Sequence, residues 1–214
     1  LGMCDWEERF LWIQMRSRLR EAPLNQRRNH AGALRFLEER SRSCGGARPQ
    51  EAIRALTSAL TQRPEDWALL RRRGLAYAAA EDYGAALEDL KAAVSQAPDS
   101  AVLHYQTGLL MRRIDAVDAA EARAAFERAL ALRPSFAEAS LELAKLDADS
   151  GADADARARF EATLRLDPNL NSARAAWIAF ALETEDWATA LSQWQNGLTR
   201  APSAPDLLRF FPQL

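Results

Sequence analysis

Clustered arginines are the first feature of this 214-residue chain that could do chemistry, with RRR at 71–73 and RR at 112–113. Guanidinium groups bind carboxylates and phosphates through paired hydrogen bonds, so such clusters occur in sites for nucleic acids and for acidic protein segments. Acidic residues balance them to a formal net charge of -2, and no aromatic residues alternate with them as in a base-stacking surface. We therefore expect no nucleic-acid partner, which leaves a protein-binding site or a solvated helix surface.

Alternating aspartates in DADSGADADAR, residues 147–157, suggest a calcium loop. A calcium-binding EF-hand loop needs glycine at its sixth position and glutamate at its twelfth. Counted from Asp147, Gly151 is the fifth residue and Ala158 is the twelfth. We interpret the segment instead as a turn between two helices, in which Gly151 reverses the chain and the following aspartates lie near the positive end of the next helix.

Residues that could catalyse a reaction are few and scattered. The two histidines, His30 and His104, have no neighbours at metal-ligand spacing, and neither a phosphate-binding glycine loop nor a nucleophile elbow is present. The two cysteines, Cys4 and Cys44, are too few for a disulfide framework, and we expect free thiols. The sequence therefore predicts no catalytic residue, no metal and no cofactor, and we expect that the chain is not an enzyme.

Prolines at a regular interval indicate the elements that position these side chains. Successive members of the set lie 34, 36, 34 and 34 residues apart, at Pro64, Pro98, Pro134, Pro168 and Pro202. Each follows a stretch of small and apolar residues with helical spacing, and each is expected to end that helix because proline lacks an amide proton. A fixed period of this length is typical of a repeat array.

The residues between the prolines repeat as well. Block 67–100 carries large, small and aromatic residues at set positions: Leu70, Gly74, Tyr77, Ala86, Leu90, Ala93 and Pro98. Blocks 101–136, 137–170 and 171–204 keep the second half of that pattern, with Phe126, Phe160 and Trp194 at the large position. Block 33–66 is a degenerate copy, in which Arg40 replaces the small residue. The pattern resembles the tetratricopeptide repeat over about residues 33 to 204.

The resemblance implies an all-α, right-handed solenoid of antiparallel helix pairs, in which small residues let the helix backbones approach closely. Repeat arrays need capping elements at their ends. Residues 1–32 are expected to form an N-terminal amphipathic helix and linker, with Trp6, Phe10 and Ile13 on one side, and residues 205–214 a C-terminal capping helix. Either end helix could instead mediate self-association or dock a partner.

The resemblance also implies a binding site, because first-helix positions in this family line a concave wall that binds peptides. Transferred to this sequence, those positions include Arg71, Leu75, Tyr105, Leu109, Arg112, Arg113, Leu141 and Lys145. Cations among leucines and a tyrosine would suit another protein or peptide segment with acidic and apolar residues. A surface charge without a partner is the alternative.

Two functions follow from these observations. The first is a noncatalytic interaction module or adaptor, and the alternative is a regulatory or targeting domain of a larger enzyme or of a secretion or envelope assembly. We expect no membrane span, since no run of about 18 apolar residues occurs. The chain begins with Leu1, so we expect its natural N-terminus to be missing. The compartment is unknown, with the cytoplasm slightly favoured over the periplasm.

Overall fold

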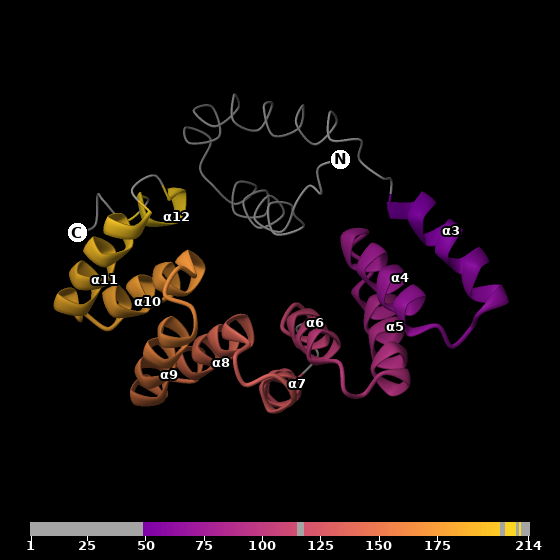
Figure 1. Ribbon diagram of the computed structural model, residues 1–214, viewed down its shortest axis with the longest axis horizontal. Coiled ribbons are helices and arrows are strands. Elements are labelled where there is room, and N and C mark those ends of the chain that lie inside the picture. Colours follow the sequence, from indigo (N-terminus) through magenta and orange to yellow (C-terminus); the bar gives the residue numbers. More distant parts are fainter. Residues whose placement is uncertain (1–48, 115–117, 202–203, 209, 211–214) are drawn as a thin grey trace, which may run out of the picture. The chain divides into compact units, whose positions relative to one another are not determined.

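The computed structural model describes residues 49–114, 118–201, 204–208 and 210, and these form helices and turns without a strand (Figure 1). The expected N-terminal helix, the first half of block 33–66, both cysteines and His30 lie outside the described residues. The chain divides into two compact units, residues 1–51 and 52–214. The helices are α3 (Pro49–Gln62), α4 (Trp67–Ala79), α5 (Tyr83–Gln96), α6 (Ala101–Met111), α7 (Ala119–Leu132), α8 (Ala137–Asp149), α9 (Asp153–Leu166), α10 (Asn171–Glu183), α11 (Trp187–Arg200) and α12 (Pro205–Leu208).

Prolines end the second helices, as the sequence predicts. Helices α3, α5, α7 and α9 each end two residues before their proline. Aspartates begin four of the described helices: Asp66, Asp82, Asp118 and Asp186 accept hydrogen bonds from main-chain N–H groups in the first turns of α4, α5, α7 and α11. A side chain of this kind satisfies an N–H group that has no partner within the helix, and it contributes about 1 kcal/mol.

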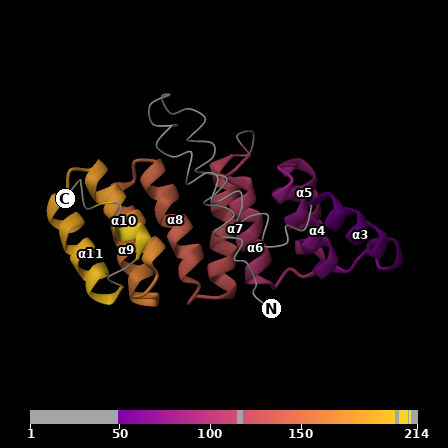
Figure 2. The ribbon, with the colours of Figure 1, turned by 90° about the horizontal axis from the view of Figure 1, so that it is seen from above.

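The helices of the second unit associate in successive pairs. Helix α4 packs against α5, α6 against α7, α8 against α9, and α10 against α11. Contacts of α5 with α6, α7 with α8 and α9 with α10 join each pair to the next, and Figure 2 shows the helices side by side. The predicted α-solenoid of helix pairs is confirmed for the described residues.

Small residues lie where two helices come closest. A Cβ atom added to Gly108 of α6 would lie 2.7 Å from Cε1 of Phe126 in α7. One added to Gly74 of α4 would lie 3.1 Å from the carbonyl oxygen of Ala86 in α5. Phe126 and Ala86 have no exposed surface. The small and large residues of the repeat therefore form the packed core of each pair.

The turns that join the two helices of a pair share a left-handed residue in three of the blocks. Glu81, Gly151 and Glu185 occupy the same position of their blocks and have φ angles of 63°, 74° and 57°. This left-handed region is open to glycine, whereas other residues enter it at a cost. The aspartate-rich segment therefore is the predicted turn, with Asp147 and Asp149 at the end of α8 and Asp153 and Asp155 in the first turn of α9.

Helix α12 continues the repeat register beyond the last pair. It begins at Pro205, where the first helix of a further block would begin. Leu207 is fully buried, as are Leu103 and Ala173 at the corresponding positions of α6 and α10. Phe210 is also buried, whereas Leu208 is 46% exposed. The described part of segment 205–214 thus covers one part of α10 and α11.

Candidate functional site

Side-chain hydrogen bonds link consecutive first helices into one surface, which we call the first-helix wall and define as α4, α6 and α8. Arg71 of α4 donates from Nε to Oε1 of Gln106 in α6, at 2.7 Å. Arg112, the residue that follows α6, reaches Glu142 of α8 at 2.5 Å. Figure 1 shows these three helices following one another along one side of the unit. Every predicted site residue lies on these helices or directly after α6.

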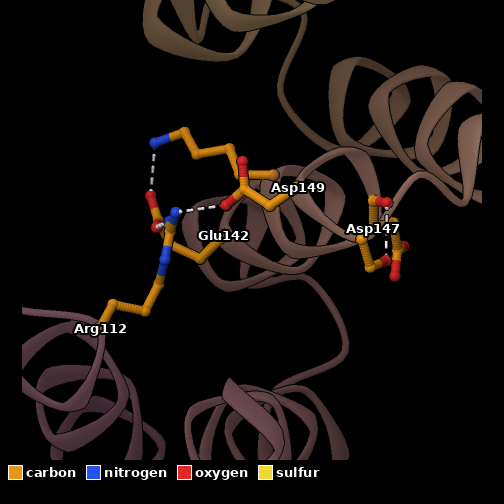
Figure 3. Close-up of polar contacts among 6 residues, drawn as sticks. Arg112, Glu142, Asp147 and Asp149 are labelled. Carbon is orange, nitrogen blue, oxygen red and sulfur yellow. Dashed lines mark hydrogen bonds and ion pairs between the residues drawn. The ribbon is translucent and has the colours of Figure 1, made fainter. Parts of the chain in front are cut away.

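Two of the predicted cations belong to a charge-balanced cluster (Figure 3). Arg112 donates to Oε2 of Glu142 and, at 3.0 Å, to Oδ2 of Asp149. Lys145 donates to Oε1 of Glu142 at 2.6 Å. Two cations and two carboxylates have no net formal charge, and Glu142 is only 7% exposed. An acidic partner would therefore have to compete with Glu142 and Asp149 for these cations.

Arg71 has a different partner from Arg112. The amide oxygen of Gln106 that accepts its hydrogen bond carries no charge, and no described carboxylate lies within ion-pair distance of its guanidinium. Its neighbours in the RRR triplet diverge: Arg72 is exposed, and Arg73 makes a bidentate pair with Asp89 through bonds of 2.7 Å. The Asp89 hydrogen bond raises the pKa of Arg73 against the opposing effect of burial. Within the described wall, Arg71 thus keeps an uncompensated charge.

Tyr105 and the leucines separate into surface and core. Tyr105 is partly buried, with its ring centre 4.9 Å from that of Phe136 and 5.9 Å from that of Phe126. Leu75 and Leu109 are partly exposed. Leu141 is only 3% exposed, and it packs with Phe160 and other residues of the core. The structure therefore places Leu141 beneath the surface that the sequence assigned to it.

Arg113 points toward a second helix. Its guanidinium carbon lies 5.6 Å from the ring centre of Tyr83, at the start of α5. A cation at this distance is attracted by the negative face of the ring. The structure thus brings Arg112 and Lys145 together around Glu142 and directs Arg113 elsewhere, although the sequence grouped all three.

A buried carboxylate paired with two arginines, which the sequence reasoning missed, lies on the other side of α8. Asp147 is 3% exposed and accepts hydrogen bonds of 2.7 Å from Arg123 of α7 and Arg159 of α9. Burial raises the pKa of Asp147, but the hydrogen bonds from Arg159 and Arg123 outweigh burial and hold that pKa below its ordinary value. The sequence contains a signal for this pair, because Asp147 stands at a position where two other blocks have the apolar residues Met111 and Ala181. An acidic residue there indicates a buried ion pair.

His104 has a local structural contact. Its Nε2 atom lies 2.8 Å from the carbonyl oxygen of Pro98, and Arg174, at the same position of its block, donates to the carbonyl oxygen of Pro168 at 2.9 Å. The described residues contain no group of three or more His, Cys, Asp or Glu side chains placed to hold a metal ion. Among those same residues, no helix has the length and apolar character needed to cross a membrane.

Comparisons with known proteins agree with the helix pairs. Two family models described as tetratricopeptide repeat match residues 40–107 and 113–177. Similar solved structures include MamA from Desulfovibrio magneticus RS-1, with a TM-score of 0.65, 20% identity and coverage of 79% of this chain and 95% of that one. YrrB, "a TPR protein with an unusual peptide-binding site", has a TM-score of 0.61, 19% identity and coverage of 87% and 90%.

A further similar structure is PilW, a "widely conserved type IV pilus biogenesis factor", with a TM-score of 0.64, 20% identity and coverage of 86% of this chain and 80% of that one. At these identities the likeness shows the fold. The family models together cover more than half of the chain, and they include all of α3, α4, α5, α7, α8 and α9. This chain therefore belongs to the tetratricopeptide-repeat family.

Proposed function

We propose that this protein is a noncatalytic adaptor that binds a segment of a partner protein on the first-helix wall. The observation that carries the proposal is Arg71, whose guanidinium is oriented by Gln106 and keeps an uncompensated charge on the wall. A cation held in place by a neutral acceptor loses little conformational freedom when it binds a carboxylate. Membership in a family of protein-binding repeats supports the same function.

The side chains around Arg71 define the chemistry of the segment. Leu75, Tyr105 and Leu109 supply partly exposed apolar surface on the same helices. The cluster of Arg112, Glu142, Lys145 and Asp149 is electrically balanced, so it favours neutral or mixed residues. The proposed ligand therefore has one carboxylate for Arg71 beside apolar residues. A uniformly acidic segment would gain no net attraction from this balanced cluster.

A random-peptide library selected on the intact protein tests this proposal. Peptides that bind are expected to contain Asp or Glu next to apolar residues, and Arg71→Glu is expected to weaken their binding at least about tenfold because attraction becomes repulsion. Arg165→Glu is the matched control, since Arg165 is an exposed arginine on the second helix α9. Fluorescence anisotropy of the selected peptides measures the dissociation constants.

Equal binding of these peptides by wild type and by Arg71→Glu would show that the wall does not use this charge. Selected peptides without any acidic residue would contradict the proposed ligand chemistry. Circular dichroism of both variants checks that their helices are intact.

A further inference from the structure

The turn and helix start at the beginning of α5 recur at the beginning of α11. Residues 81–87 read EDYGAAL and residues 185–191 read EDWATAL. Asp82 and Asp186 begin these helices, each accepting a hydrogen bond of 3.2 Å from a main-chain N–H group in its first turn. Glu81 and Glu185, which precede them, share the left-handed backbone. The surroundings of the α5 start therefore show what this local structure can bind.

The last turn of α6 and the residues after it cover the start of α5. Tyr83, Leu87 and Ile114 pack against a buried cluster that contains Leu110, and the guanidinium of Arg113 lies over the ring of Tyr83. These residues form a short pattern, an apolar residue followed three positions later by arginine and then by another apolar residue. Aromatic, aliphatic and cationic contacts thus act together at this helix start.

The equivalent surface of α11 is exposed. Trp187 is 57% exposed and Leu191 is 41% exposed, although they occupy the positions of Tyr83 and Leu87. Two apolar side chains at positions i and i+4 lie on one face of a helix. We call Glu185, Trp187 and Leu191 the end face.

Helix α12 packs against the second half of α11, after the end face. The indole N–H of Trp194 donates there to the carbonyl oxygen of Leu207 at 3.0 Å, and the side chain of Leu207 lies beside Gly197.

The charged residues near the end face favour a cationic partner. Glu183, the last residue of α10, and Glu185, in the turn before Trp187, are exposed, while Asp186 pairs with Arg157 at 3.1 Å. Exposed carboxylates next to an indole ring favour a guanidinium, which can stack on the ring and pair with an acid at the same time. An acidic or uncharged helix lacks both interactions.

We propose that the end face binds the C-terminal turn of an amphipathic helix from a partner protein, with arginine three positions after one apolar residue and directly before another. The arginine stacks on Trp187 beside Glu185, and the apolar residues cover Leu191. This surface lies on a second helix, so the proposal is independent of ligand binding at Arg71.

A helical peptide with the sequence of residues 101–114, AVLHYQTGLLMRRI, is the probe. A covalent bridge between its positions 104 and 108 holds it helical, because isolated helices of this length are marginal in water. Fluorescence anisotropy measures its binding to the intact protein. Replacing both Trp187 and Leu191 by Ser is expected to raise the dissociation constant of the peptide at least about tenfold. A peptide that carries glutamate at the position of Arg113 is expected to bind the wild-type protein at least about tenfold more weakly.

Matched substitutions elsewhere control for general loss of apolar surface. Trp67 is 42% exposed at the start of α4, and Leu166 is 45% exposed at the end of α9. The double variant with Ser at Trp67 and Leu166 is expected to bind the peptide within about twofold of wild type, because most exposed side chains contribute little to a distant contact.

Equal binding of the peptide by wild type and the Trp187 and Leu191 double variant would overturn the proposal. Light scattering addresses a second occupant: if wild type is a dimer and this double variant is a monomer, another copy of the chain covers the end face and the proposed partner is wrong. Loss of binding by Arg71→Glu alone, with the end-face variant unaffected, would likewise place the peptide on the first-helix wall.

Discussion

Arginines that are equivalent in the sequence differ in the folded chain because their neighbours differ. Arg71 donates a hydrogen bond to a neutral amide, Arg73 forms an ion pair with Asp89, and Arg112 forms ion pairs with two carboxylates. Arg174 is 5% exposed and bonds Gln193, and burial together with the nearby charge of Arg200 lowers its pKa. The charge that an arginine presents to a partner thus depends on contacts with residues 16 to 37 positions away in the sequence, which the local sequence does not show.

Glycine substitutions separate close packing from helix propensity. Gly108→Ala is expected to lower the free energy of unfolding by about 1 to 2 kcal/mol, because the clash with Phe126 exceeds the helical preference of alanine. Gly84→Ala is the control: Gly84 lies in the first turn of α5, its nearest contact would be 3.9 Å away, and a gain of about 0.5 kcal/mol is expected. Urea unfolding measures both. A stabilised Gly108→Ala protein would show that Phe126 does not restrict this position.

At the scale of elements, the structure identifies which polar contacts join one helix pair to the next. Asp147 links α7, α8 and α9 through Arg123 and Arg159, while Arg112 joins α6 to α8. The helices themselves are predictable from the prolines and the spacing of small residues. The burial of Leu141 could not be predicted in this way. Its position faces the wall in the family pattern, but in this chain the Leu141 side chain packs with Phe160.

Asp147→Asn tests the buried carboxylate. The substitution is expected to lower the free energy of unfolding at pH 7 by about 2 kcal/mol, less than for a fully buried pair because both arginines are about one-third exposed. Hydrogen bonds hold the folded-state pKa of Asp147 below its unfolded value. The carboxylate therefore stabilises the fold above about pH 4, and that contribution is lost as pH falls through the lowered pKa.

Urea unfolding of wild type and Asp147→Asn between pH 7 and pH 3 measures this dependence. The difference between the two proteins is expected to stay constant down to about pH 5 and to shrink below about pH 4. A difference that grows toward acid pH would contradict the assigned direction of the pKa shift.

At the scale of the second unit, each pair contacts chiefly its neighbours along the chain. Stability in such an array is close to a sum of local terms, so the ends open more readily than the middle. Most of α8 is buried, whereas α3 has one buried residue, Leu60.

Hydrogen exchange followed by mass spectrometry measures this gradient. Amides of α8 are expected to exchange at least about tenfold more slowly than those of α3, because local opening is easier where few side chains are buried. Gly108→Ala is expected to accelerate exchange in α6 and α7 and to leave α11 nearly unchanged. Uniform acceleration along residues 52–214 would instead show that the unit unfolds as a single cooperative body.

The sequence by itself determined the family, the helix pairs and the residues of their close contacts, because prolines and small residues act through local backbone geometry and through a period that repeats along the chain. The turn at Gly151 followed from the same register. Only the tertiary structure decided which charges remain available on the wall, that Leu141 is buried, that Asp147 joins three helices and that Trp187 lacks the cover that Tyr83 has. Those properties depend on contacts between helices, within a repeat and from one repeat to the next. A side chain's partners there are set by packing across the helices rather than by its position along one of them.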